Sequence, residues 1–329
     1  MSDTQAKWQV AVVVPAYKVK THILQVLQAM PDLVSAVYVI DDACPQGSGR
    51  FVESNTTDPR VTVLYLQDNQ GVGGAVMHGY SAALVAGADI IVKIDGDGQM
   101  DPSLIANFID PIATGEADYT KGNRFNNLET IKSMPTVRIV GNAVLSFLNK
   151  LSSGYWNIFD PTNGYTAIHA QVCKKLPLNK ISRRYFFESD MLFRLNTLRA
   201  VVVDIPMDAK YAEEKSNLKI SKIIGEFSLK HSKNFIKRIF YNYFLRDLSL
   251  ASIQLIVGLL LTLFGVVYGG YHWYASAQVG LPTAAGTVMV AAMPVLVGLQ
   301  FVLSFIGYDI ASVPRRPLQR SLTKRPTNV

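Results

Sequence analysis

The sequence predicts an α/β protein in which a domain with a parallel sheet precedes an amphipathic helix and a hairpin of two membrane-spanning helices. Runs rich in Val and Ile alternate with segments whose apolar residues recur at helical spacing, as is typical of a parallel sheet covered by helices. No Asp, Glu, Lys or Arg lies between Asp247 and Asp309, which indicates helices that cross a membrane. With 329 residues, the chain can hold one large domain and a smaller part.

Short apolar runs bounded by turn-forming residues predict the strands. The strongest runs lie at Val10–Val14, Ala36–Ile40, Val61–Leu66 and Ile90–Ile94. Weaker strand signals follow at Ala117–Lys121, Tyr165–His169 and Val201–Ile205.

Helices are predicted at His22–Met30, Gly74–Ala86 and Pro102–Ala113. The last helix is preceded by Asp101, whose side chain can cap it, and has Pro102 at its first position. The Gly-rich stretch DNQGVGGAVMHG does not fit the phosphate-binding pattern GxxxxGK[ST]. We interpret it as close packing of the second helix on the sheet.

The charge-free region predicts two spans, Leu250–Tyr271 and Thr283–Tyr308, each at or above the roughly 20 residues that cross a hydrocarbon core. The linker between them, HWYASAQVGLP, has no Lys or Arg, whereas both flanks are basic. The basic residues are Lys230, Lys233, Lys237, Arg238 and Arg246 before the first span and Arg315, Arg316, Arg320, Lys324 and Arg325 after the second. Because basic residues mark the cytoplasmic side, we expect both ends of the hairpin in the cytoplasm.

These patterns predict four parts: a cytoplasmic domain at 1–215, an amphipathic juxtamembrane segment at 216–248, the hairpin at 249–310, and a basic cytoplasmic tail at 311–329. The segment Leu218–Arg246 mixes Ile, Phe and Leu with Lys at spacings of three and four. It is expected either to lie in the membrane interface or to pack on the domain as an ordinary amphipathic helix.

The net charge of +7 gathers beside the spans, where each Lys or Arg gains about 1 kcal/mol near anionic headgroups. The membrane is therefore predicted as the partner of these charges, and no nucleic acid is expected. A solvated basic face without a specific partner is the alternative interpretation.

Acidic residues follow two of the predicted strands. Asp41 and Asp42 come after the second strand, and Asp95 and Asp97 after the fourth, in IIVKIDGDGQMDP. In open parallel sheets, ligands bind beyond the carboxyl ends of the strands. Carboxylates that gather there repel one another unless a cation compensates them, and a divalent ion completed by substrate phosphates meets this need. For the Asp-x-Asp pattern alone, a helix cap with a solvated turn is the alternative.

With these motifs the sequence resembles the family 2 glycosyltransferases, which have the A-type nucleotide-sugar-binding fold. More narrowly, it is similar to the polyprenyl-phosphate glycosyltransferases, such as dolichyl-phosphate mannose synthase and the bacterial enzymes that load undecaprenyl phosphate with a sugar. The resemblance covers residues 10–222 and rests on VVVPAYK, IDDAC, IDGDGQ, KGNRF, DPTNGYTAI and YFFESDMLFRL. The hairpin with cytoplasmic ends is similar to that of the bacterial members, which implies an integral protein of the bacterial inner membrane.

The resemblance implies contacts to the nucleotide-sugar donor. Pro15 and Tyr17 are expected to border the nucleobase, and one of Asp41 and Asp42 to contact the base or ribose. The Asn-Glu pair that follows this Tyr in relatives is replaced by Lys18-Val19, so an acidic contact to the nucleotide is not expected there.

The resemblance also implies metal and phosphate ligands. Asp95, Asp97 and Gln99 match a DxDxQ motif that holds Mg²⁺ or Mn²⁺ against the diphosphate. Asp95 is therefore also expected to bind the nucleotide-sugar donor, and Asp97 is expected to be catalytic. Arg124 in KGNRF and Arg138 in MPTVRIVGN are candidates for binding phosphate, because guanidinium can bind two phosphate oxygens at once. A surface salt bridge is the alternative role for either arginine.

Three further acids are catalytic candidates through the same resemblance. Asp160 in DPTNGYTAI corresponds to an Asp beside the reacting sugar. Glu188 and Asp190 in YFFESDMLFRL are both candidates for the acid on the acceptor side.

The expected reaction is inverting transfer of a sugar from a nucleotide-diphosphate donor to a polyprenyl phosphate, giving a lipid-linked sugar for cell-surface glycan modification. A UDP-linked donor is favoured, while GDP, the identity of the sugar and formation of a homo-oligomer are left open. Two alternatives also stay open: a family 2 transferase that extends a lipid-linked glycan, and an inactive membrane-anchored scaffold that binds nucleotide.

Overall fold

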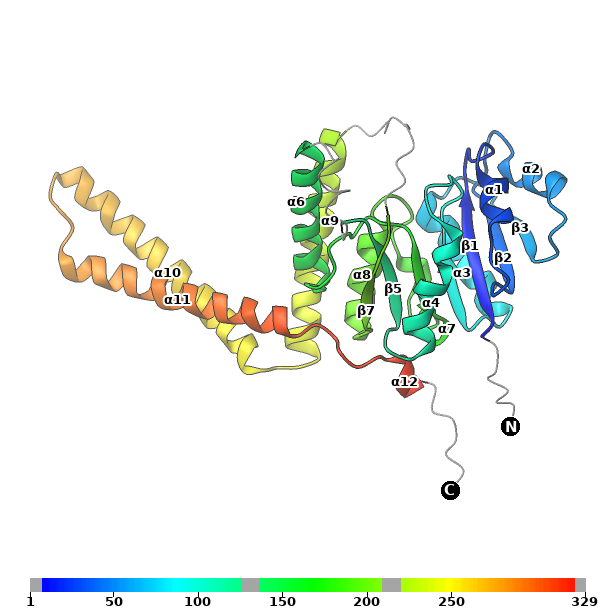
Figure 1. The fold of residues 1–329 in the computed structure, drawn as a ribbon. Helices are drawn as coiled ribbons and strands as arrows, with labels where there is room; N and C mark the ends of the chain where they lie inside the picture. Colours follow the sequence, from blue (N-terminus) through cyan, green and yellow to red (C-terminus); the bar gives the residue numbers. More distant parts are fainter. Residues whose placement is uncertain (1–7, 126–135, 209–219, 323–329) are drawn as a thin grey trace, which may run out of the picture. The chain divides into compact units, whose positions relative to one another are not determined.

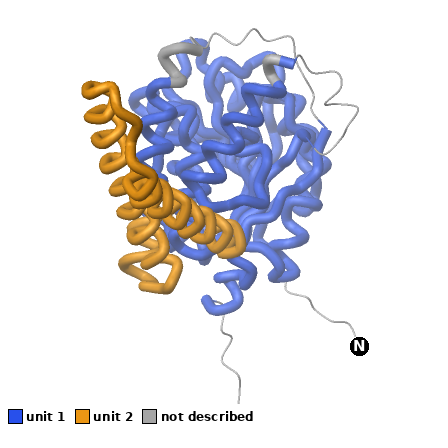
Figure 2. The backbone as a smooth tube through the Cα atoms, turned by 90° about the vertical axis from the view of Figure 1, so that its left-hand side faces the viewer, with its two compact units in different colours: residues 1–235, 314–329 blue, residues 236–313 orange. Residues whose placement is uncertain are grey.

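The computed structural model describes residues 8–125, 136–208 and 220–322, and the chain divides into two units (Figures 1 and 2). Unit 1 contains residues 1–235 and 314–329, and unit 2 contains residues 236–313. The chain therefore leaves unit 1 within helix α9 (Ile220–Phe240) and returns to it after helix α11 (Ala285–Ala311).

Unit 1 is built on a seven-stranded sheet with the order β3-β2-β1-β4-β6-β5-β7. The strands are β1 (Val10–Ala16), β2 (Ala36–Asp41), β3 (Val61–Tyr65), β4 (Ile90–Lys93), β5 (Tyr119–Asn123), β6 (Thr166–His169) and β7 (Val202–Pro206). All seven predicted strands are confirmed, and β1 to β4 are parallel as expected. However, β6 runs antiparallel to both of its neighbours, so the prediction of a parallel sheet is wrong there. Apolar runs indicate buried strands but not their direction.

The strand register brings several loops to one edge of the sheet. Ala16 at the end of β1 lies beside Asp41, and Val13 lies beside Lys93 at the end of β4. Because β6 is antiparallel to β4, its first residue Thr166 also lies beside Lys93. The segment before β6 therefore meets the segments after β1, β2, β4 and β5 at this edge, which we call the carboxyl edge.

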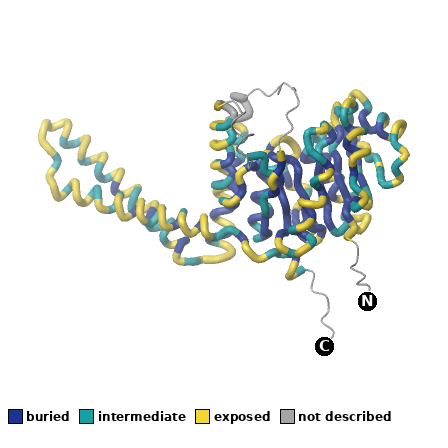
Figure 3. Tube along the Cα trace, in the orientation of Figure 1, coloured by how far each residue is buried: buried dark blue, intermediate teal, exposed yellow. Residues whose placement is uncertain are grey.

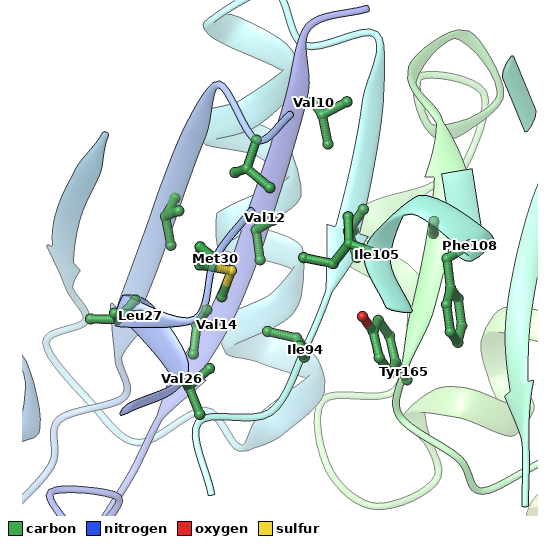
Figure 4. Packing of buried hydrophobic residues seen from close by; sticks show 14 of the residues in the cluster. Val10, Val12, Val14, Val26, Leu27, Met30, Ile94, Ile105, Phe108 and Tyr165 are labelled. Atoms are coloured by element: carbon green, nitrogen blue, oxygen red, sulfur yellow. The ribbon is translucent and has the colours of Figure 1, made fainter. Parts of the chain in front are cut away.

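Helices cover both faces of the sheet. Helices α1 (Ile23–Gln28), α2 (Ser48–Asn55) and α4 (Ile105–Ala113) pack on one face over a large apolar cluster, in which Phe108 stacks on Tyr165 (Figure 4). Helices α3 (Val72–Val85) and α8 (Phe187–Leu198) lie on the other face. Gly79 of α3 is so close to β1 that an added Cβ would lie 2.2 Å from Cγ1 of Val13, which confirms the predicted close packing of this helix.

Asp101 caps the helical segment that leads into α4, as predicted. Its Oδ1 accepts hydrogen bonds from the backbone N and the Oγ of Ser103, at 3.0 and 2.7 Å. Pro102 begins a 3₁₀ turn, Pro102–Leu104, that continues as α4. The charge of Asp101 thus serves the helix start.

Helix α9 and the π-helical turn Tyr241–Leu245 form the predicted amphipathic segment. Within unit 1, α9 packs on α6 (Thr136–Ser153) and α8: Nδ1 of His231 lies 2.7 Å from Oγ of Ser152, and Asn234 donates to Asp190 at 3.2 Å. Leu229 on the same helix is 74% exposed. This contact fits the alternative in which the helix packs on the domain.

Unit 2 contains the helical hairpin of α10 (Leu250–Val279) and α11, both long and apolar enough to cross a membrane. Glycines allow close contact between them. A Cβ added at Gly265 would lie 2.5 Å from the carbonyl oxygen of Ala291, and a Cβ added at Gly258 would lie 2.9 Å from the carbonyl oxygen of Gly298. Small residues at such contacts are typical of membrane helices. Most of the large apolar side chains of both helices are exposed, as a lipid environment requires (Figure 3).

The two helices do not end where the predicted spans end. Helix α10 continues past Tyr271 to Val279, and α11 runs over Ala285–Ala311, whereas the predicted second span covers 283–308. Ala and Gln in the predicted linker favour helix, and the helix stops only at Gly280, which has a φ of +67°. The connection is therefore shorter than predicted.

A buried ion pair joins the start and the end of unit 2. Nη1 and Nη2 of Arg238 in α9 bind the two carboxylate oxygens of Asp309 in α11, at 2.5 and 3.0 Å. The hydroxyl of Tyr243 donates to the same carboxylate at 2.6 Å. These two buried charges of opposite sign thus compensate one another, which offsets the cost of burying them.

The predicted basic tail contains a folded segment. Asp118, fully buried in unit 1, accepts hydrogen bonds at 2.7 Å from the backbone N of Leu318, Gln319 and Val201. Gln319 is the first residue of the short helix α12 (Gln319–Leu322). Its side-chain Nε2 donates to the carbonyls of Ile112, in helix α4, and of Ala117. Residues 318–322 therefore belong to the domain, because a charged acceptor is paired with their amides.

We expect Asp118→Asn to loosen this segment. The amide offers one acceptor oxygen instead of two, so at least one charge-assisted hydrogen bond of about 2 kcal/mol is lost, and the melting temperature in detergent should fall by about 5 °C. Hydrogen exchange of residues 318–322 should become faster.

Arg320→Ala is the control, because Arg320 is exposed and its Nε donates to the Gly115 carbonyl at the surface. Its melting temperature should stay close to that of the wild type. Unchanged exchange in Asp118→Asn would contradict the assignment of Asp118.

Candidate active site

The two acids after β2 hold the loops around them. The carboxylate of Asp41 accepts from the backbone N of Cys44 at 2.7 Å and of Gly49 at 2.6 Å. The carboxylate of Asp42 accepts from the backbone N of Gln70 at 2.7 Å and of Gly71 at 2.8 Å. Both acids are buried, so these amides compensate their charges and fix two loops at the carboxyl edge.

The segment after β1 offers an exposed aromatic ring. Pro15 is partly buried near the end of β1, while Tyr17 is 42% exposed. Nζ of Lys18 lies 5.3 Å from the centroid of the Tyr17 ring, and the backbone N of Lys18 donates to Sγ of Cys44. The ring is thereby held beside the loop that Asp41 organises, and an exposed aromatic face can stack on a planar ligand.

The Asp-x-Asp segment follows β4 in a tight turn. Oδ1 of Asp97 accepts from the backbone N of Gln99 at 3.0 Å, and Gly98 between them has a φ of +79°, which favours glycine. Oδ1 of Asp95 lies 2.6 Å from Nζ of Lys93, which is buried at the end of β4. Both aspartates are partly exposed, so this turn presents carboxylates at the carboxyl edge.

Asp160 and Arg124 form a two-point ion pair. Oδ2 of Asp160 accepts from Nε of Arg124 at 2.7 Å, and Oδ1 accepts from Nη2 at 2.9 Å. Burial alone would raise the pKa of Asp160, but the hydrogen bonds and charge of Arg124, together with the charge of Lys121, lower it below its usual value. Asp160 is thus ionised and orients the guanidinium at the carboxyl edge.

Two further charged groups lie beneath this edge. Lys121 in β5 is fully buried and its Nζ donates to the Asn163 carbonyl; burial lowers the pKa of Lys121 to about 8. Burial raises the pKa of Glu188, in the first turn of α8, although the charges of Lys93 and Lys121 oppose that rise. The negative charge of Asp95 also raises the pKa of Glu188.

Asp190, the other acid of the same motif, has different partners. Its Oδ2 accepts from the backbone N of Ser182 at 2.9 Å and from Nε of Arg194 at 3.2 Å, and its Oδ1 accepts from Asn234. These contacts tie α8 to α9. The side chain of Arg138, in helix α6, lies outside the described residues.

Sequence patterns did not single out Lys93, Lys121 or Asp204. Oδ2 of Asp204, in β7, accepts from Asn123 at 3.0 Å and from the backbone N of Phe159 at 3.3 Å. Its buried Oδ1 has no hydrogen-bond partner within the described ranges, and burial raises the pKa of Asp204 to about 6. A charged residue within a predicted strand was the signal that could have found all three.

A small cavity lies next to Asp204. It has a volume of about 190 Å³ and is lined by Asn123, Phe125, Ile139, Ala143 and Phe159. The two phenylalanine rings meet edge to face at 5.2 Å between centroids. The carboxyl edge thus combines a polar centre with an apolar recess on the side of β5.

The described residues contain no group of three or more His, Cys, Asp or Glu side chains arranged to bind a metal. Asp95 and Asp97 can supply one or two carboxylate ligands from a partly exposed turn. Such a set fits Mg²⁺ or a similar ion that keeps several waters and is completed by substrate phosphates. It does not form an all-protein metal cage.

Comparisons with known proteins agree with this architecture. Residues 11–177 match the model of Glycosyl transferase family 2. The chain is 30% identical over 222 residues to the undecaprenyl-phosphate mannosyltransferase of Micrococcus luteus, an alignment that covers 66% of this chain and 90% of that protein. It is 34% identical over 154 residues to the UDP-N-acetylglucosamine–dolichyl-phosphate N-acetylglucosaminyltransferase of Methanococcus voltae, covering 47% of this chain and 61% of that protein.

A solved structure shows the same fold. Glucosyl-3-phosphoglycerate synthase from Mycobacterium tuberculosis, crystallised with Mg²⁺ and UDP, superposes with a TM-score of 0.54 at 18% identity, covering 71% of this chain and 80% of that one. The predicted glycosyltransferase fold of unit 1 is therefore confirmed.

The pKa of Asp204 predicts a pH-dependent stability. An ordinary Asp titrates near about 3.9, so raising the folded-state pKa to about 6 makes the protonated acid favour folding, and this contribution disappears as the pH rises through about 6. Asp204→Asn removes the titration. Its melting temperature relative to the wild type should therefore increase between pH 4 and pH 7 and then level off.

Asp68→Asn, at an exposed position, is the matched control and should follow the wild type at each pH. A constant offset between Asp204→Asn and the wild type across this range would show that Asp204 does not titrate as described.

Proposed function

The chain belongs to glycosyl transferase family 2, and we propose that it is an inverting, metal-dependent enzyme that transfers a sugar from a nucleotide-diphosphate donor to the phosphate of a membrane polyprenol. The observation that carries the proposal is the similarity to an undecaprenyl-phosphate mannosyltransferase along 90% of that relative's length. The name of a second relative, an enzyme acting on dolichyl phosphate, supports the same class of acceptor.

The donor is assigned to the carboxyl edge. Tyr17 offers a ring for the nucleobase, and the loops held by Asp41 and Asp42 shape the pocket beside it. Asp95, Asp97 and Gln99 would hold Mg²⁺ or Mn²⁺, which when bound supplies positive charge at the diphosphate of the donor. A UDP-linked donor is favoured, because UDP occupies the structural neighbour.

Phosphate binding is assigned to Arg124, with Arg138 as the second candidate. Asp160 holds the guanidinium of Arg124 at two points, so the arginine is oriented before any substrate binds. Because the arginine is already paired, its side chain loses little freedom when a phosphate approaches. Asp160 would then act beside the sugar as the partner of this arginine.

The acceptor needs little help from a base. The second pKa of a phosphate monoester is near 6, so a polyprenyl phosphate is mostly a dianion at neutral pH and can attack the sugar directly. Direct displacement inverts the configuration at the reacting carbon. Of the two acceptor-side candidates, Glu188 is favoured, because the Asp190 carboxylate is engaged by Ser182, Arg194 and Asn234.

The membrane hairpin suits a lipid acceptor. Taking a polyprenol out of the bilayer would cost about 0.8 kcal/mol for each CH₂ group, so the enzyme must come to the lipid. Helices α10 and α11 would anchor it in the membrane, with unit 1 and both termini in the cytoplasm. The bacterial inner membrane is the proposed location.

Glycolipid formation tests the proposal directly. Purified protein with Mg²⁺, undecaprenyl or dolichyl phosphate, and a panel of UDP- and GDP-sugars should give a lipid-linked sugar with one donor, identified by mass spectrometry. Asp97→Asn should lower the rate by more than about 100-fold, because even outer-shell partners of a metal change activity about 10- to 100-fold.

Asp101→Asn is the matched control: it removes a neighbouring charge, and Asn retains the helix cap. Its rate should stay near that of the wild type. If no donor yields product, or if Asp97→Asn is as active as Asp101→Asn, the proposed reaction is wrong.

Vesicles test the orientation independently. In sealed right-side-out vesicles, added protease should leave unit 1 intact, whereas inverted vesicles should expose it to digestion, because both flanks of the hairpin are basic. Detergent-opened vesicles show that the protease can cut. Digestion in right-side-out vesicles would overturn the cytoplasmic assignment.

A further inference from the structure

Lys93 lies at an unusual place for a charged residue. It ends β4 between Val13 of β1 and Thr166 of β6, and its side chain is 1% exposed. Its Nζ lies 2.6 Å from Oδ1 of Asp95, the first acid of the Asp-x-Asp turn. A buried ammonium is costly to desolvate, so stability alone does not explain a lysine here.

The surroundings of Lys93 keep this ion pair in place. An added Cβ at Gly164, in the segment before β6, would lie 2.3 Å from Nζ of Lys93 and 2.8 Å from Oδ2 of Asp95. The backbone of Gly164 therefore packs directly against the ion pair. Met100 closes another side, because its Sδ accepts from the backbone N of Asp95 at 3.2 Å.

The ion pair limits what Asp95 can offer to a cation. One carboxylate oxygen is engaged by an ammonium, and a divalent ion bound to the other would lie within a few ångströms of a fixed positive charge. Like charges at such separations repel strongly when they are partly shielded from water. A free metal ion is thus disfavoured, whereas an ion that arrives with a diphosphate brings compensating negative charge.

We propose that Lys93 is a positioning residue that acts as an internal counter-cation to Asp95, so that the site binds a divalent ion weakly alone and strongly together with a nucleoside diphosphate. This inference rests on the proposed function for the role of Asp95. Lys93 fixes the direction of the carboxylate and couples metal binding to donor binding.

Lys121 provides a matched comparison within the same cluster. It is buried on the same face of the sheet, since both lysines pair with Thr166, and it also interacts with Glu188. However, its Nζ donates to the carbonyl of Asn163 rather than to the carboxylate of Asp95. Removing Lys121 deletes a nearby positive charge without freeing an oxygen of Asp95.

Binding of Mn²⁺ by the purified full-length protein, followed by electron paramagnetic resonance with and without UDP, tests the inference. Lys93→Met should lower the dissociation constant for Mn²⁺ alone by about tenfold, within the range known for outer-shell partners of a metal, and UDP should then strengthen Mn²⁺ binding less than in the wild type. Lys93→Arg should restore wild-type coupling. Lys121→Met should change Mn²⁺ affinity by less than about threefold, a minor part of that range.

Melting curves establish that each variant is folded, and Lys93→Gln replaces Lys93→Met if the latter is not. Unchanged or weaker Mn²⁺ binding by the neutral Lys93 variant overturns this inference alone, as does an equal effect of Lys121→Met. Failure of the wild type to bind Mn²⁺ even with UDP overturns both the proposed metal site and this inference. Glycolipid formation by the wild type, measured separately, distinguishes these cases.

Discussion

Compensation of negative charge at the carboxyl edge is the constraint on which unit 1 depends. Asp41 and Asp42 are compensated by backbone amides, so their charges organise loops. Asp160 is compensated by Arg124, and Asp95 by Lys93. Asp204 has weaker compensation, so burial raises its pKa. Each acid thus has a different local environment, and the carboxylates of the partly exposed Asp-x-Asp turn remain accessible to a cation that comes with a substrate.

The reversed direction of β6 makes this compensation possible. If β6 ran parallel to β4, the segment Asp160–Tyr165 would enter the sheet at the opposite edge, far from the ends of β4 and β5. In the antiparallel arrangement, Asp160 meets Arg124, and the Asn163 carbonyl meets Lys121. Gly164, in the same segment as Asp160 and Asn163, packs on the Lys93–Asp95 pair. One change of strand direction therefore joins the half of the sheet that carries Asp41, Asp42 and the Asp-x-Asp turn to the half that carries the other candidate groups.

Local patterns predicted what depends on local sequence. The strands, the cap at Asp101 and the two apolar helices each follow from residue type and spacing within a short window. The direction of β6 and the partner of each acid depend on contacts between residues far apart in the chain, so the motif could not separate Glu188 from Asp190. Lys93 and Lys121 were visible as charges inside predicted strands, but only the strand register shows that they flank the same threonine.

The return of the chain to unit 1 limits how the hairpin can cross a membrane. Residues before the hairpin and residues 318–322 after it belong to one folded unit, because Asp118 binds the amides of Leu318 and Gln319. A folded domain lies on one side of a bilayer, and its buried carboxylate cannot pair with amides on the other side. The number of crossings between these segments must then be even. Two apolar helices satisfy this requirement. The basic residues on both flanks of the hairpin independently indicate that both ends lie on the same side of the membrane.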